Sequence, residues 1–79
     1  MIIDPDSPDP AYVQLAAILR QRIASGEITG ALPSLRALQE ESGLGEFAVT
    51  HALRVLAGEG LIFSVPRRGY YVRQPSAED

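Results

Sequence analysis

The sequence predicts a mainly α fold with a small β-hairpin, the three helices and wing of a winged helix-turn-helix. Two helical segments, residues 35–42 and 46–58, are separated by only three residues, Gly-Leu-Gly. Helices joined by so short a glycine-containing turn must cross steeply, which is the helix-turn-helix geometry. Two short apolar segments, 61–65 and 70–73, then flank a turn, as the strands of a hairpin do. Residues 10–73 are therefore expected to form one domain, with the hairpin as its wing.

The first helix is expected at residues 10–25. Asp9 is predicted to cap it, with Pro10 as its first residue, where the missing N–H costs no hydrogen bond. Gly26 follows as a C-terminal stop signal. Residues 1–9 interleave aspartates with prolines and are expected to form a flexible, extended acidic arm. The apolar positions that recur at helical spacing are Leu15, Ile18, Leu19 and Ile23.

The second and third helices have their own end signals. Ser34 is predicted to cap the second helix and Gly43 to end it. In the connector before it, Ile28 and Leu32 are expected to contribute a brief strand edge. After the hairpin, residues 74–79 are expected to be a disordered tail. The side chains that these two helices should bury are Leu35, Leu38, Val49, Leu53 and Leu56.

Composition excludes several classes of protein. A chain of 79 residues makes one domain with a modest core, since it buries only about 60% of its unfolded surface. The absence of cysteine excludes disulfides and thiolate zinc sites. No apolar run approaches the roughly 20 residues that cross a bilayer, and the N-terminus is acidic where a signal peptide is basic. We therefore expect a cytoplasmic protein with no membrane contact. The lone histidine has no cysteine partner and no evident serine or paired-carboxylate constellation, which points away from an enzyme, and we expect no cofactor or metal.

The net charge of −3 conceals an uneven distribution. Half of the ten acids lie near the two ends of the chain, whereas all seven cations are arginines within its body. Between residues 47 and 75, only Glu59 opposes four arginines. Phosphate contact requires such a positive local field, and arginine suits bidentate contacts with phosphate and guanine. The preference for arginine over lysine is equally compatible with a compositional habit of the source genome.

A set of residues with a characteristic joint order and spacing runs through residues 11–72. Its members are Tyr12, Gln14, Leu15, Leu19, Arg20, Ile23, Gly26, Leu32, Pro33, Ser34, Arg36, Leu38, Gly43, Val49, Ala52, Leu53, Leu56, Glu59, Gly60, Leu61, Gly69 and Val72. In this set the chain resembles the N-terminal DNA-binding domain of the GntR family of bacterial transcriptional regulators. The resemblance implies a repressor-like protein that docks its third helix in the major groove of DNA and its wing against the neighbouring minor groove.

The chain departs from the family pattern where DNA contacts are expected. A Ser/Thr-Arg pair usually opens the third helix, with a second Arg one turn on, and those positions are Gly45, Glu46 and Thr50 here. Leu35 replaces the acid of the usual Pro-Ser-Glu-Arg, and Gln39 replaces a small residue at the helix crossing. The wing has Arg-Arg-Gly-Tyr-Tyr in place of glycine-basic-glycine-Thr-Phe. The connector is also shorter than usual, and we expect no effector-binding domain.

The third helix supplies six predicted DNA contacts, which are Gly45, Glu46, Phe47, Thr50, His51 and Arg54. Helical spacing places Glu46, Thr50 and Arg54 on one face and Phe47 and His51 on the adjacent one. Residues at the start of a docked helix approach base edges. Glu46 would accept from a cytosine amino group, Phe47 would pack on a thymine methyl group, and Thr50 would touch a base or a phosphate.

Each of these assignments has a simpler alternative. Glu46 would only complement the positive end of the helix. Phe47 would be a hydrophobic staple, with its ring packed against the turn that precedes the third helix. His51 would donate to a phosphate or act as a pH sensor, or it would simply face solvent with no special role.

Two predicted contacts lie at the start of the second helix. Ser34 and Arg36 place backbone N–H groups and a cation where the backbone of a bound duplex would pass. The alternative for Arg36 is an ion pair with Glu40, four residues further along the helix.

The wing supplies the remaining predicted contacts. Arg67 and Arg68 lie at the hairpin tip, where arginine enters a narrow minor groove, or they belong to a plain solvated turn. Tyr70 and Tyr71 alternate across the returning strand, so one should pack inward on the third helix and the other outward. We include Tyr70 among the contacts, although packing within the sheet is an alternative for either tyrosine.

The sequence therefore predicts a sequence-specific transcriptional regulator that binds double-stranded DNA, acts as a repressor and responds to no small-molecule effector. A palindromic site would need two copies of the domain. Pairing through residues 1–9 or through the first helix, pairing only on DNA, and binding as a monomer remain open. The alternative function is that of a winged helix that has lost its DNA contacts and binds protein through the third helix.

Overall fold

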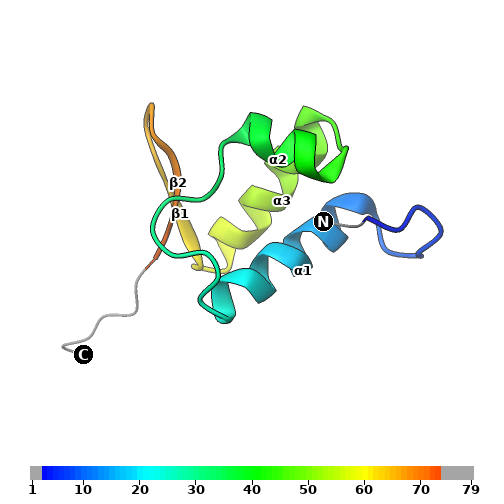
Figure 1. Ribbon diagram of the computed structural model, residues 1–79, viewed down its shortest axis with the longest axis horizontal. Coiled ribbons are helices and arrows are strands. Elements are labelled where there is room, and N and C mark those ends of the chain that lie inside the picture. The colour runs from blue at the N-terminus through cyan, green and yellow to red at the C-terminus, as the bar shows by residue number, and fades with distance from the viewer. Residues whose placement is uncertain (1–2, 74–79) are drawn as a thin grey trace.

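The computed structural model describes residues 3–73, in which three helices precede one hairpin (Figure 1). The elements are α1 (Ala11–Ala24), α2 (Leu35–Ser42), α3 (Glu46–Gly58), β1 (Ile62–Val65) and β2 (Gly69–Val72). The structure confirms the predicted winged helix-turn-helix, and the predicted tail at 74–79 lies outside the described residues. No helix within residues 3–73 has both the length and the apolar character that a membrane span requires.

The start of α1 differs from the prediction, because Asp9 does not cap the helix. Pro10 is the N-cap residue, with a ψ of 155°, and its carbonyl accepts from the amides of Val13 and Gln14 at 3.0 and 3.2 Å. The Asp9 carbonyl accepts from the side-chain amide of Gln14 at 2.9 Å. No side chain caps the start of α1, and the Gln14 side chain instead ties the preceding backbone to the helix.

Residues 4–9 form a series of turns instead of the predicted extended arm (Figure 1). The Asp4 amide donates to Gln14 Oε1 at 2.7 Å, and Gln14 Nε2 donates to the Asp4 carbonyl at 2.9 Å. The Ser7 amide donates back to the Asp4 carbonyl at 3.3 Å. Because one glutamine side chain satisfies both backbone groups of Asp4, the segment folds back against the start of α1.

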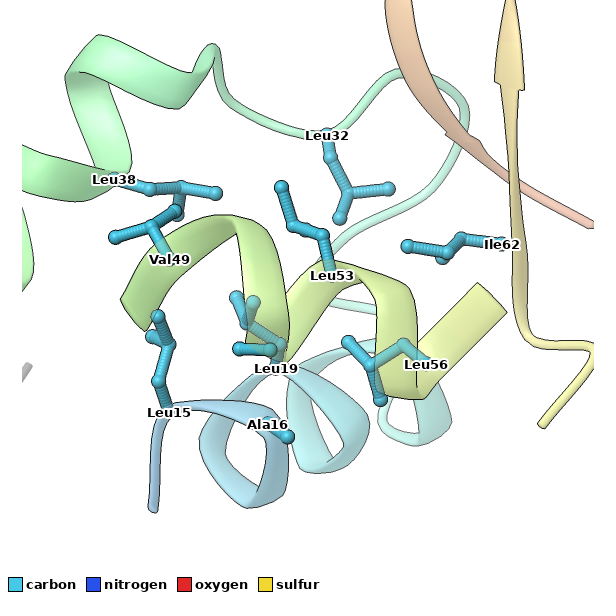
Figure 2. Close-up of a cluster of buried hydrophobic side chains, with 10 residues drawn as sticks. Leu15, Ala16, Leu19, Leu32, Leu38, Val49, Leu53, Leu56 and Ile62 are labelled. Atoms are coloured by element: carbon cyan, nitrogen blue, oxygen red, sulfur yellow. The ribbon is translucent and has the colours of Figure 1, made fainter. Parts of the chain in front are cut away.

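The core lies where α1, α2 and α3 meet the hairpin (Figure 2). Ala16 and Ala52, one from each of the two long helices, are fully buried, and such small side chains allow helices to pack closely. Leu35, which was predicted to be buried, is only partly so, as are Ile18 and Ile23 of the apolar pattern in α1. The buried set is Leu15, Ala16, Leu19, Leu32, Leu38, Val49, Ala52, Leu53, Leu56 and Ile62.

Two serines fix the ends of α2. Ser34 Oγ accepts from the Ala37 amide at 3.0 Å, which confirms the predicted cap. At the other end, Gly43 has a φ of 75° and donates its amide to the Gln39 carbonyl at 2.8 Å, as a left-handed C-terminal residue does. The Ser42 hydroxyl donates to the Leu38 carbonyl at 2.6 Å and also accepts from the turn that follows. These bonds fix the direction in which the chain enters α3.

The hairpin is joined to the helices by the connector between α1 and α2. β1 and β2 pair antiparallel, with Ile62 opposite Val72 and Val65 opposite Gly69. Ala31 forms an isolated bridge with Tyr71, and the amide of Leu32 donates to the Tyr70 carbonyl at 2.9 Å. The connector therefore contributes the brief strand edge that was predicted, and Leu32 is itself buried. This contact holds the wing against the body of the domain.

Candidate nucleic-acid interface

Five of the predicted contact residues on α3 line one shallow hollow on the surface of the domain. They are Glu46, Phe47, Thr50, His51 and Arg54. Gly45, the sixth predicted contact, is the N-cap of the helix and provides no side-chain cap. The structure thus brings together the residues that helical spacing placed on two adjacent faces.

Phe47 stands out on this face because its side chain is 93% exposed. A staple would pack the ring against the preceding turn, so that alternative is wrong. Glu46 is the first residue of α3 and the acid of its first turn, a position that favours a negative charge. This placement agrees with both roles considered for Glu46, complementing the helix end and facing a base.

His51 lies against Tyr12, a contact that its position in the sequence did not predict. Its ring stacks on that of Tyr12 in α1, with ring centroids 3.8 Å apart and planes 9° apart. His51 is exposed overall, yet the stack restricts how its ring can turn. The simple interpretation of a solvent-facing histidine therefore misses a contact between α1 and α3.

A second hollow separates α3 from the wing. Ser34 and Leu35 at the start of α2 line one side, and Arg68 and Tyr70 of the wing line the other. Thr50 lines this cleft as well as the hollow on α3, so the two depressions adjoin each other on the surface. The start of α2, the middle of α3 and the wing thus share a surface.

The two tyrosines of β2 point in opposite directions, as predicted. Tyr70 packs against the core, while Tyr71 stacks on Phe63 with ring centroids 6.1 Å apart. Arg73 lies over the same Phe63 ring, 5.4 Å from its centroid. The inward tyrosine therefore lies at the cleft, and the outward one belongs to an aromatic cluster on the other face of the hairpin.

The tip of the wing holds Arg67 in an uncommon backbone conformation. The Arg68 amide donates to the Val65 carbonyl at 2.9 Å, which closes a four-residue turn. Within residues 3–73, Arg67 is the one non-glycine residue with a positive φ, at 67°. Both arginines of the turn are exposed. The turn thus presents two guanidinium groups at the far end of the hairpin.

The distribution of ion pairs shows which cations can meet a ligand. Arg20 donates to both carboxylate oxygens of Glu59, at 2.9 and 2.6 Å. Arg22 lies 3.5 Å from Glu27 and 3.3 Å from Glu41. Of the arginines in residues 3–73, those without an ion pair within 4.0 Å are Arg54, Arg67, Arg68 and Arg73. Three of these four lie on α3 and at the wing tip, and the fourth is on the outer face of the hairpin.

The role of Glu59 therefore differs from the expectation that it opposes the arginines around it. The hydrogen bonds from Arg20 hold the pKa of the Glu59 carboxyl below its ordinary value, and the Arg20 charge acts in the same direction. The carboxylate is thus paired with α1 and, within the described chain, forms no ion pair with the arginines of α3 and the wing. Sequence order could not show this pair, because its members are 39 residues apart.

Arg36 makes the ion pair that was its alternative, with Nε 3.4 Å from Glu40 Oε2. The two side chains are 87% and 71% exposed, and such pairs contribute a few tenths of a kcal/mol at most. Arg36 can therefore exchange Glu40 for a phosphate at little cost.

The turn formed by residues 4–9 leaves the face of α3 uncovered. It borders a separate depression, whose other side is formed by α1 and by the turn between α2 and α3 at Gly43 and Leu44. Asp4 and Asp9 lie there, while the exposed residues of α3 line a different hollow. The acids of the N-terminal segment are thus kept apart from the arginines of the wing.

Comparisons with known proteins agree with this geometry. Residues 11–72 match the family model of the bacterial regulatory proteins, gntR family. The chain is 36% identical to the HTH-type transcriptional repressor NagR of Bacillus subtilis over 80 residues, which cover 99% of this chain and 33% of NagR. It is 39% identical to the mannosyl-D-glycerate transport/metabolism system repressor MngR of Escherichia coli, over 82% of this chain and 28% of MngR. The chain thus spans about a third of the length of these relatives.

Solved structures show the same fold. YtrA from Sulfolobus acidocaldarius, a GntR-family transcription factor, superposes with a TM-score of 0.83 at 36% identity, over 94% of this chain and 65% of YtrA. The DNA-binding domain of AraR superposes with a TM-score of 0.85 at 24% identity, over 92% of this chain and 95% of that domain. From the extent of the family match and the identity with NagR and YtrA, we conclude that the chain belongs to the gntR family of bacterial regulatory proteins.

Proposed function

We propose that residues 10–73 bind double-stranded DNA in a sequence-specific manner, as the DNA-binding part of a transcriptional repressor. The observation that carries this proposal is the shared surface formed by α3, the start of α2 and the wing, on which Arg54, Arg67 and Arg68 make no ion pair within the described chain. NagR and MngR are repressors, and the AraR domain of the same fold was crystallised with an operator.

The proposed docking follows from the shape of this surface. α3 enters the major groove with its first turn toward the base edges, the usual geometry of a recognition helix. The start of α2, with Ser34 and Arg36, meets the phosphate backbone. Arg67 and Arg68 reach the adjacent minor groove, where the negative potential is strongest when the groove is narrow. Tyr70 lines the cleft beside the wing. It can contact DNA only if the sugar-phosphate backbone of the duplex enters that cleft.

The number of copies bound depends on the symmetry of the operator. A palindromic operator takes two copies of the domain, and we propose that they pair on DNA. No small-molecule effector is assigned to the described residues. Selection of bound sequences from a random duplex pool tests the two-copy stoichiometry, because two copies related by a two-fold axis would enrich an inverted repeat.

Fluorescence anisotropy with the selected duplex tests the central claim. Binding should weaken steeply with salt, since each neutralised phosphate releases counterions. Arg68→Gln and Arg36→Gln should each lower the slope of log affinity against log salt by about one.

Arg73→Gln provides a matched control. It removes the same charge, but from the outer face of the hairpin, where Arg73 covers Phe63. Its salt slope should equal that of the wild type. The proposal is wrong if no duplex is bound at low salt, or if all three substitutions change the slope equally.

A further inference from the structure

Phe47 is an unusual residue for the surface of so small a domain. Within residues 3–73, only two large apolar side chains are exposed, Phe47 at 93% and Phe63 at 38%. Phe63 has partners, because it stacks on Tyr71 and lies under Arg73. No aromatic or cation–π partner is found for Phe47 in the described chain. Its ring therefore contributes little to the fold and is free to contact another molecule.

The position of this ring limits what that molecule can be. Phe47 is the second residue of α3, in the turn of a docked recognition helix that comes nearest to the base edges. It shares its hollow with Thr50 and Arg54, one and two turns further along the helix. If α3 enters the major groove, as proposed above, Phe47 enters with it.

The charges around Phe47 favour the floor of the groove over its phosphate walls. Glu46 immediately precedes it, is exposed, and has no ion pair within residues 3–73. A carboxylate at this place would be repelled by phosphates, whereas it can accept from base amino groups. The cations that suit phosphates lie further along α3, at Arg54, and on the wing, at Arg68. The first turn of α3 is thus suited to bases.

We propose that Phe47 makes this domain select thymine, by packing its ring on the thymine 5-methyl group in the major groove. That methyl group is the apolar feature that distinguishes a T·A pair in this groove. The inference rests on the proposed DNA binding and adds the base that the first turn of α3 recognises. A contact with thymine also gives a role to the apolar side chain of Phe47, which directly follows Glu46, the position where members of the family usually carry arginine.

The test replaces single thymines of the selected duplex with deoxyuridine, which removes only the 5-methyl group. Wild-type protein should lose roughly fourfold in affinity at one thymine per bound domain, the factor expected for removing one buried carbon group. Phe47→Ala should bind the thymine duplex more weakly and should bind thymine and uracil duplexes equally. Because the side chain is exposed, the variant should keep the wild-type melting temperature.

Phe63→Ala is the matched control, since it removes the other exposed phenylalanine from the far face of the hairpin. It should retain the wild-type preference for thymine. The inference is overturned if wild-type protein binds DNA with the expected salt dependence but no uracil substitution weakens it, or if Phe47→Ala keeps the preference. Loss of a protein partner on Phe47→Ala, with duplex affinity unchanged, would overturn it as well. Failure of the wild type to bind any duplex would instead refute the proposed function itself.

Discussion

The ring of His51 lies face to face with the ring of Tyr12, at 3.8 Å between centroids and 9° between planes. Farther along the same two helices, Arg20 binds Glu59 across the same interval of sequence, 39 residues. Both pairs join residues 39 positions apart in the sequence. A step forward along α1 is therefore matched by an equal step forward along α3, so the two helices run alongside each other in the same direction (Figure 1). The aromatic pair lies near the starts of the helices and the ion pair near their ends.

The aromatic pair should be energetically coupled. We expect a double-mutant cycle with Tyr12→Leu and His51→Ala to show a coupling of about 0.5 to 1.5 kcal/mol, the usual range for stacked rings. Urea unfolding of the four proteins measures it. If the two single effects add to within about 0.3 kcal/mol, the stack contributes nothing to stability.

The ion pair should make stability depend on pH. Arg20 lowers the pKa of Glu59 in the folded protein below its value in the unfolded chain. The pair's contribution is therefore complete at neutral pH and is lost as the pH falls through the lowered pKa of the folded state. Glu59→Gln should melt at a lower temperature than the wild type at pH 7. The difference should begin to shrink near the ordinary glutamate pKa of about 4.3 and should disappear below the lowered pKa of the folded state.

Glu40→Gln is the control for this measurement, because Glu40 forms a more exposed pair with Arg36. It should change the melting temperature less at pH 7. The effect of Glu59→Gln should also shrink with added salt, since both members of the pair are partly exposed. A melting difference that persists unchanged in acid would show that the carboxylate charge is not what stabilises the fold.

Ile62, the buried residue of β1, is only 1% exposed, so shortening its side chain stepwise should destabilise the fold stepwise. Ile62→Val should cost about 0.5 to 1.5 kcal/mol and Ile62→Ala about 2 to 5 kcal/mol, because the cavity grows with each carbon removed. Urea unfolding measures both. Equal costs for the two variants would mean that the hairpin moves inward to fill the space.

Local rules account for the parts of this fold that the sequence predicted. The cap at Ser34, the left-handed end at Gly43 and the short turn before α3 depend on residues only a few positions apart. The turn signals on either side of Leu32 also predicted a strand edge there, although its partner on β2, Tyr70, lies far along the chain and was not predicted. Helix caps and short turns can be predicted from a single sequence, because each depends on neighbouring residues.

The contacts that were missed, or assigned to the wrong residue, depend on tertiary packing or on a choice between equivalent donors. Asp9 was predicted to cap α1, but α1 has no side-chain cap, and Asp9 is held through its carbonyl by the side chain of Gln14. The partners of His51 and Glu59 depend on how α1 lies along α3, which no local pattern specifies. On the candidate interface, the sequence placed the α3 residues on two adjacent faces, but only the structure shows that Thr50 borders both their hollow and the cleft beside the wing.

The last prediction separates stability from binding at the tip of the wing. Arg67 has a φ of 67°, and a left-handed conformation costs a non-glycine residue roughly 1 to 2 kcal/mol. Glycine removes that cost but gains about 0.4 to 1 kcal/mol of freedom in the unfolded chain. Arg67→Gly should therefore be more stable than the wild type by about 0.5 to 1 kcal/mol in urea unfolding.

Arg67→Ala completes the comparison, because it loses the guanidinium but keeps the strained backbone. Its stability should stay close to that of the wild type, while both variants should bind DNA more weakly and lower the salt slope by about one. If Arg67→Gly were less stable than Arg67→Ala, the positive φ would carry no strain. If instead glycine stabilises the hairpin and weakens DNA binding, the strained turn persists because of what the Arg67 side chain contacts outside the domain.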